Sequence, residues 1–318
     1  MRYSLYCEYN FLTGFYDNRP IIKDEGIFSE DTQIYMWKKY CDLFLKNSNL
    51  YLNICVEDFI NKSNHPFVKM IMKKKTEGSI KLKFDRFPQL FKDFDIDQIQ
   101  KHAIFFISDN ENCEQLQNNY GMLFISNDDL YRKASILFSD DTFRKIDNNT
   151  DWNILKQFGH PCNFILLIDN FIFSNEKSIF EKDFKMLFDS LLPQKHKRCI
   201  SITIRAKRPS AKDLSGKENK HWKDWKEIFD DDDWKNKVEI YCEEIIKEKR
   251  PIKIKFQEID NSEHDRHLIT NYYWFSSGYG FILNHNQRAK GTDIHIHHIT
   301  QPYVLDRMDE LINKKTKE

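Results

Sequence analysis

Continuously apolar runs alternate with helical patterns along the chain. The segments 103–107 and 164–168 are apolar throughout, which is typical of strands that are buried on both faces of a sheet. Between such runs, apolar residues recur at helical spacing, as they do in 31–45 and 178–192. Strands that alternate with helices in this way predict an α/β fold built on mainly parallel sheets.

The same pattern locates the other main elements. The expected strands are 3–6, 50–56, 103–107, 122–125, 164–168, 200–204 and 252–259, and the expected helices are 31–45, 111–118, 178–192 and 233–249. Acidic or amide residues follow several of these strands directly. In open α/β sheets, ligands bind beyond the carboxyl ends of the strands, so these residues are candidates for a functional site.

One polar segment, 139–161, interrupts the pattern. It is rich in Asp and Asn, it ends at Pro161, and the rhythm of strand and helix restarts after it. Such a segment is typical of a boundary between domains. We therefore expect two α/β domains, 1–150 and 151–318, each with a mainly parallel or mixed sheet flanked by helices.

The charge balance limits how nucleic acid can be bound. The chain has 49 basic and 49 acidic residues, and its formal net charge is zero. Proteins that coat duplex nucleic acid non-specifically usually carry a basic excess, so a contact here has to come from a local patch. The loop after the strand at 200–204 offers one, and we expect its side chains Arg205, Lys207 and Arg208 to bind substrate.

The cysteines and the hydropathy pattern indicate the compartment. The seven cysteines are dispersed, odd in number and free of CxxC pairs, which fits a reducing environment better than a disulfide framework. No apolar leader and no transmembrane segment is visible in the sequence. These features predict a cytoplasmic protein.

The segment 264–280 carries the sharpest chemical signal. Its spacing resembles the phospholipase D superfamily signature, H-x-K, four residues, D, six residues, G-S, and the matching residues are His264, Arg266, Asn271 and Gly278. The resemblance, which covers about 160–300, implies that His264 attacks phosphorus and Arg266 binds the non-bridging oxygens. A neutral imidazole is nucleophilic near neutral pH, and a nearby cation neutralises the charge that develops in the transition state. Gly278 and Gly280 give backbone that can approach a phosphate closely.

The pattern is degenerate, and three interpretations stay open. Asn271 cannot act as the anion that the family places there, and Tyr279 replaces the serine. The family needs two such motifs and this chain has one, so catalysis requires a homodimer. The His264-Asp265-Arg266 form is also similar to the phospholipase D-like domain behind the MIT module of an ESCRT-associated protein, which is a binding domain. Cleavage, binding of phosphate or another polyanion, and a purely structural turn are the alternatives.

The first half resembles PIN-type ribonucleases. Segment 5–12 is similar to their opening strand, which ends in an acid followed two residues later by Asn, and 124–130 is similar to their later strand ending in Thr-x-Asp. The resemblance implies that Glu8, Asp109 and Asp128 hold Mg²⁺ or Mn²⁺, which activates water for attack on a phosphodiester. Acids at strand ends also serve as helix caps and turn formers, which is the competing explanation.

Two further features have both a functional and a structural interpretation. Asp293, His295 and His297 fall on one face of a strand, where they can hold zinc or simply form a polar face. The aromatic residues of 272–275 can stack on bases or pack in a core between strands.

These observations lead to two hypotheses about function. The first is a nuclease that cleaves phosphodiesters, and analogy alone places such an enzyme in a prokaryotic toxin or phage-defence system. The second is a non-catalytic subunit that uses a degenerate phospholipase D-like domain to bind nucleic acid, a protein partner or a lipid head group. In either form we expect RNA or DNA as the partner.

Overall fold

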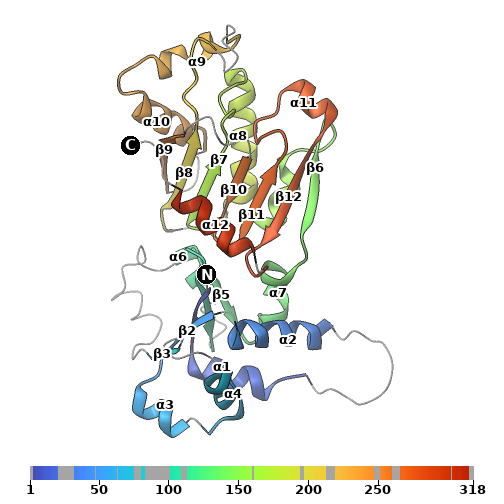
Figure 1. Ribbon diagram of the computed structural model, residues 1–318, viewed down its shortest axis with the longest axis vertical. Helices are drawn as coiled ribbons and strands as arrows, with labels where there is room; N and C mark the ends of the chain where they lie inside the picture. Colours follow the sequence, from blue (N-terminus) through green and yellow to red (C-terminus); the bar gives the residue numbers. More distant parts are fainter. Residues whose placement is uncertain are drawn as a thin grey trace. The chain divides into compact units, whose positions relative to one another are not determined.

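The structure is a computed structural model of the 318-residue chain. It describes residues 3–20, 32–46, 48–62, 64–74, 80–82, 101–108, 113–159, 161–193, 197–212, 219–246, 251–259, 266–301 and 303–314. The chain forms two compact units (Figure 1), which consist of Met1–Gln117, Met122–Ser139 and Thr300–Leu305, and of Asn118–Gly121, Asp140–Ile299 and Asp306–Glu318. The main division thus falls between Ser139 and Asp140, earlier than the boundary expected at residue 150.

The first unit contains a five-stranded parallel sheet in the order β3-β2-β1-β4-β5. Its strands are β1 (Tyr3–Cys7), β2 (Ser48–Leu52), β3 (Ile80–Leu82), β4 (Ile104–Ile107) and β5 (Leu123–Ser126). The helices of this half are α1 (Tyr9–Asp17), α2 (Thr32–Leu45), α3 (Val56–Lys62), α4 (Pro66–Lys74), α6 (Cys113–Tyr120) and α7 (Leu130–Phe138).

Aromatic side chains hold this sheet together. On one face, Tyr6 stacks on Phe105 with ring centroids 4.9 Å apart, and Phe105 stacks on Phe124 at 4.7 Å, across β1, β4 and β5. On the other face, Phe106 contacts Phe44 of α2 at 4.8 Å. Burial on both faces is why β4 is apolar without alternation.

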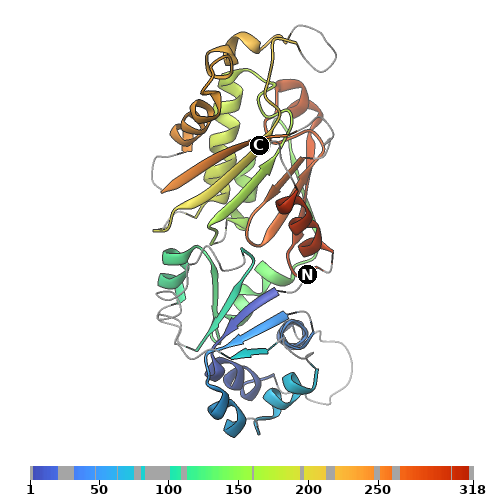
Figure 2. The same cartoon turned by 60° about the vertical axis from the view of Figure 1, so that its left-hand side comes forward.

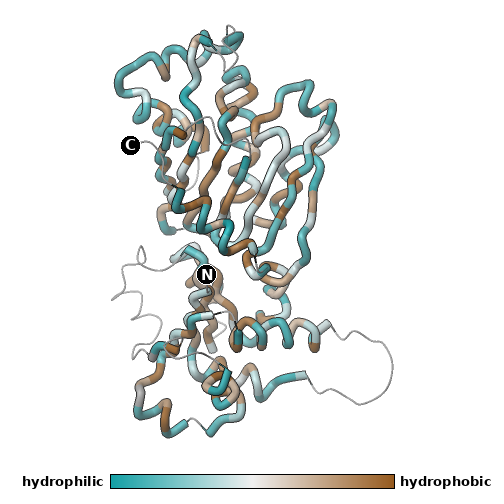
Figure 3. Tube along the Cα trace, in the orientation of Figure 1, coloured by the Kyte–Doolittle hydropathy of each residue, from teal (hydrophilic) through white to brown (hydrophobic). Residues whose placement is uncertain are grey.

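The second unit contains a seven-stranded mixed sheet in the order β6-β12-β11-β10-β7-β8-β9. Its strands are β6 (Thr142–Ile146), β7 (Phe164–Ile168), β8 (Ile200–Ala206), β9 (Ile252–Glu258), β10 (Arg266–Ile269), β11 (Tyr273–Ser277) and β12 (Thr292–His298). Strands β7, β8 and β9 are parallel, and every pair from β7 through β10 to β6 is antiparallel. β7 is hydrophobic over its whole length, as Figure 3 shows.

Figures 1 and 2 show that helices lie alongside this sheet. They are the 3₁₀ helix η2 (Trp152–Phe158) and the α-helices α8 (Lys177–Leu191), α9 (Trp222–Phe229), α10 (Trp234–Ile246), α11 (His285–Lys290) and α12 (Val304–Asn313). α8 buries a stripe of Phe180, Phe184, Leu187 and Phe188, as its helical spacing predicts. No helix in the described ranges is long and apolar enough to cross a membrane.

The predicted fold class is confirmed, because the chain has two helix-flanked sheets, one parallel and one mixed. The continuous apolar runs became β4 and β7 as expected. The segment 139–161, in which the domain boundary was expected, contains β6 and η2, and the main division of the chain falls at its start. β6 is an edge strand that pairs with β12, and Phe143, one of its two apolar side chains, is 63% exposed, so its own sequence lacks the apolar signal of a buried strand.

Candidate functional site

A pocket of about 500 Å³ lies in the second unit, on β10, β11 and β12. Its lining includes the charged and aromatic residues Arg266, His267, Trp274, Tyr279, Asp293, His295 and Arg307, together with Gly278. The lining contains two arginines and one aspartate, so its formal charge is positive even when both histidines are neutral. A positive pocket with aromatic walls suits an anionic ligand that carries flat rings.

The topology of the sheet positions Arg266. β10 runs antiparallel to β7, so Arg266 at its start lies beside the carboxyl end of β7, as the sequence predicts. Its Nη1 donates a hydrogen bond of 2.8 Å to the carbonyl oxygen of Gly278, and its guanidinium carbon lies 4.9 Å from the centre of the Phe171 ring. The side chain stays 20% exposed. Arg266 is therefore fixed in orientation and still open to a ligand.

A buried carboxylate, Asp169, lies behind this arginine. Its Oδ1 is 3.9 Å from Arg266 Nε and accepts a hydrogen bond from the Phe171 amide at 2.9 Å, and its Oδ2 accepts one from the Phe281 amide at 3.0 Å. Burial raises the pKa of Asp169, although the two amides and Arg266 oppose the shift. Asp265 lies outside the described residues, and the carboxylate that the structure places near Arg266 is that of Asp169.

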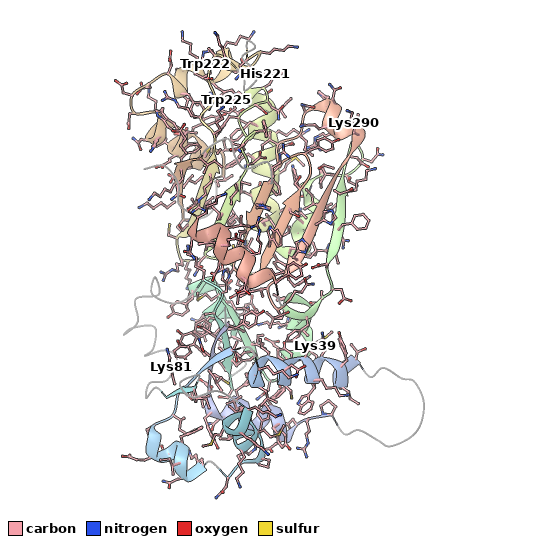
Figure 4. All side chains as sticks on the ribbon, viewed as in Figure 1. Lys39, Lys81, His221, Trp222, Trp225 and Lys290 are labelled. Atoms are coloured by element: carbon pink, nitrogen blue, oxygen red, sulfur yellow. The ribbon has the colours of Figure 1, made fainter. Side chains whose placement is uncertain are left out.

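The loop after β11 is held by side chains from other parts of the unit. Asn175 Nδ2 donates to the Ile282 carbonyl at 2.9 Å, and Asp183 Oδ2 accepts from the Leu283 amide at 2.8 Å. The Asn175 carbonyl accepts in turn from Nε1 of Trp225, which Figure 4 labels on α9. With the bond from Phe281 to Asp169, three consecutive residues of the loop are tied down. The carbonyl of Gly278 is thereby presented to Arg266 by a preorganised loop.

Gly280 is required in this loop, for a reason the sequence did not reveal. Its φ is +104°, and a Cβ atom at this position would lie 2.7 Å from Asp169 Oδ2. Gly278 is different, because a Cβ there would meet no atom within 4 Å. Gly280 thus makes room for the buried carboxylate, whereas Gly278 leaves open space beside Arg266.

Two histidines lie on the pocket side of the sheet. Trp274 Nε1 donates to His267 Nδ1 at 3.1 Å, so this ring nitrogen acts as a hydrogen-bond acceptor. His267 is 4% exposed, whereas His295 is exposed.

Asp293, His295 and His297 share one strand face as expected, and His297 pairs with Asp141 at 3.0 Å. Of the aromatic stretch 272–275, only Trp274 is part-exposed, and the other three rings are buried.

The structure does not bring Asn271 to this pocket. Asn271 follows the other end of β10, it is fully buried, and its Oδ1 accepts from the amides of Asn163 at 3.0 Å and Phe164 at 3.3 Å. These bonds tie the turn between β10 and β11 to the start of β7. These partners give Asn271 a structural role, and the catalytic role expected for it stays a prediction. His264 lies outside the described residues.

Two arginines of the predicted basic loop are engaged at helix ends. Arg205 donates through both terminal nitrogens to the carbonyls of Leu311 and Ile312 near the end of α12, and through Nε to Gln257 at 2.7 Å. Arg208 donates to the Phe229 carbonyl at the end of α9. Cations commonly stabilise the last carbonyls of helices in this way. The structure therefore gives both residues a partner other than substrate, and substrate binding by half-buried Lys207 stays a prediction.

In the first unit, part of the expected metal site lies at the carboxyl ends of the strands, which is the edge of the sheet where the sequence predicts it. The strand order reverses between β1 and β4, where ligands of such sheets bind, and Glu8 and Ser108 follow these strands. Glu8 Oε2 accepts from the Ser108 amide at 2.7 Å and also from its hydroxyl. Asp128 is exposed after β5, and Asp109 lies outside the described residues. In the part of the chain that is described, no three His, Cys, Asp or Glu side chains group to hold a metal, so Mg²⁺ or Mn²⁺ binding stays a prediction.

Comparison of the chain with protein-family models, curated proteins and solved structures gave no match. The phospholipase D-like and PIN-like resemblances therefore stay predictions. The geometry and charge of the pocket on β10, β11 and β12 are the basis for assigning a function.

Proposed function

We propose that this protein binds nucleic acid through its phosphodiester groups, at the pocket on β10, β11 and β12. The observation that carries the proposal is the pairing of two arginines, Arg266 and Arg307, with the aromatic residues Trp274 and Tyr279 in one lining. Guanidinium groups present a planar fork of donors that matches the oxygens of a phosphate.

The contacts and the remaining donors of Arg266 support this proposal. Among the described residues its one hydrogen bond goes to Gly278, so most of its five N–H groups remain for a ligand. Its contacts with Phe171 and Asp169 fix the side chain before any ligand arrives. Preorganisation of this kind lowers the entropy lost on binding.

Arg307 supplies the second cation from a more exposed position. Its Nη1 lies 2.7 Å from Glu310 Oε2, with 36% and 69% of the two side chains exposed. Such an exposed pair on a helix contributes little stability, so a phosphate can replace the carboxylate at small cost.

The aromatic residues favour nucleic acid over a phosphate-bearing lipid head group. Trp274 is part-exposed and Tyr279 is 45% exposed, and flat rings of this kind stack on bases. A lipid head group has no base to stack on them. The distance of Asn271 from the pocket favours binding over cleavage, because Asn271 stands where the phospholipase D-like pattern has its acidic residue.

Fluorescence anisotropy with labelled decauridylate and decathymidylate, titrated between about 50 mM and 200 mM salt, tests the proposal. We expect Arg266→Ala to weaken binding of both probes about tenfold or more, as loss of hydrogen bonds to a charged group does. The slope of log Kd against log salt should fall by about 0.7, the value for one phosphate contact on a single strand.

Arg307→Gln is a second variant, in case Arg266→Ala does not fold. Among the described residues, Arg307 is paired only with an exposed carboxylate, so its replacement should not affect folding. It should weaken binding while leaving the melting temperature unchanged. Lys253→Gln, an exposed lysine on the far edge strand β9, is the matched control and should change neither. If both arginine variants bind like the control, or if the wild type binds neither probe, the proposal is wrong.

A further inference from the structure

A row of four side chains extends from the pocket across one face of the sheet, from buried His267 on β10 to the edge strand β6. The register pairs His267 with Ser276, Ser276 with His295, and His295 with Phe143, so the row crosses β10, β11, β12 and β6. Paired residues point to the same face, and adjacent strands are about 4.8 Å apart, so the row is about 14 Å long. The pocket is therefore one end of a longer surface.

Phe143 lies at the far end of this row, on the edge strand β6. The side chain is 63% exposed, and its ring centroid is 6.5 Å from that of His295. A single exposed ring beside polar neighbours is not the broad apolar patch that marks a protein interface. It is a suitable place for one flat ligand group to stack.

Lys145 adds a cation beside the pocket. It follows Phe143 by two residues and lies on the same face, opposite Asp293. A Cβ at Gly291 would overlap Cε of Lys145, so the lysine stem lies directly over Gly291, which lines the pocket. Lys145, Arg266 and Arg307 outnumber Asp293 on this surface, while Asp141 is paired with His297 and Glu310 is paired with Arg307.

We infer that the nucleic acid bound here is single-stranded and lies across the face of β10, β11, β12 and β6, with a base on Phe143 and a phosphate near Lys145. This inference rests on the proposed function and adds the substrate class. Bases of a duplex are stacked and paired internally, whereas those of a single strand are free to lie on aromatic rings. Four-stranded sheet faces in known RNA-binding modules stack about two or three bases in this manner.

The test compares probes of different length and form by anisotropy. Wild type should bind labelled decauridylate more tightly than the dinucleotide UpU and more tightly than a blunt RNA duplex. Phe143→Ala should weaken decauridylate binding about fivefold or more, because one stacked base contributes at least that much. It should leave UpU binding unchanged, since a dinucleotide fills the pocket without reaching β6.

Ile240→Ala is the matched control, because Ile240 is 47% exposed on α10 and does not line the pocket. Decauridylate binding that is unchanged by Phe143→Ala but lost with Arg266→Ala overturns this inference and leaves the proposed function standing. Equal affinity for duplex and single strand also overturns it. If Arg266→Ala and Arg307→Gln weaken no probe, the proposed function itself has failed.

Discussion

Gly280 offers the sharpest test of how the site is held together. Its φ of +104° lies where an L side chain is strained, and a Cβ would approach Asp169 Oδ2 to 2.7 Å. Neither the buried carboxylate nor the loop can move easily, because Oδ2 accepts the Phe281 amide at 3.0 Å. Gly280→Ala should therefore disturb the backbone and this hydrogen bond together.

The magnitude follows from these two effects. A left-handed backbone conformation costs a residue with a Cβ about 1–2 kcal/mol, and a lost hydrogen bond to a charged group costs about 1.5–3 kcal/mol. The sum is about 2.5–5 kcal/mol of unfolding free energy. For a unit of this size, each kcal/mol lowers the melting temperature by about 2–4 °C.

Gly278→Ala is the matched control, because a Cβ there meets nothing within 4 Å and its φ is not positive. Thermal unfolding of both variants, followed by circular dichroism, should show a large loss for Gly280→Ala and little change for Gly278→Ala. Decauridylate binding should also weaken in Gly280→Ala, since Arg266 is positioned by Asp169. Equal melting temperatures for the two variants would refute the role assigned to Asp169.

Two other predictions concern charged side chains of the second unit. Burial raises the pKa of Asp183 above its ordinary value of 3.8, so the stability that this residue contributes is present below pH 3.8 and is lost as the pH rises through the raised pKa. Asp183→Asn should therefore flatten the fall in unfolding free energy over this pH range, as measured by urea unfolding. An unchanged pH profile would contradict the role of burial at Asp183. Arg205→Ala should destabilise the unit by about 2–4 kcal/mol, because buried carbonyls of α12 lose their donors, whereas Lys207→Ala should not. Weakened oligonucleotide binding by Arg205→Ala without lost stability would restore the substrate-binding role expected from the sequence.

The central strands were predictable from the sequence because burial on both faces leaves little choice of residue. β7 is apolar at every position, and no other element explains such a run. β6 was not predicted because only Ile146 is fully buried, and the register of the strand comes from pairing with β12. Pairing with a strand that is distant in the sequence does not produce a recognisable hydrophobic pattern in the segment itself.

The site was predictable in part for a related reason. The motif located Arg266 correctly at a carboxyl edge, but its partner Asp169 is distant in sequence and became recognisable only when β7 and β10 were paired. Asn271 and Arg205 show the converse limit. A polar residue type does not reveal whether its donors and acceptors serve a ligand or the protein's own backbone, and here both serve backbone groups.

Photo-crosslinking tests the location of the binding site most directly. Decauridylate carrying 4-thiouridine would be bound to the unaltered protein, irradiated, and the modified peptides identified by mass spectrometry. We predict adducts on Trp274, Tyr279 and Phe143, the aromatic residues of the pocket and of the sheet face. Adducts confined to the first unit or to the loop at 207–212, with the oligonucleotide bound, would contradict the proposal that the pocket on β10, β11 and β12 binds nucleic acid.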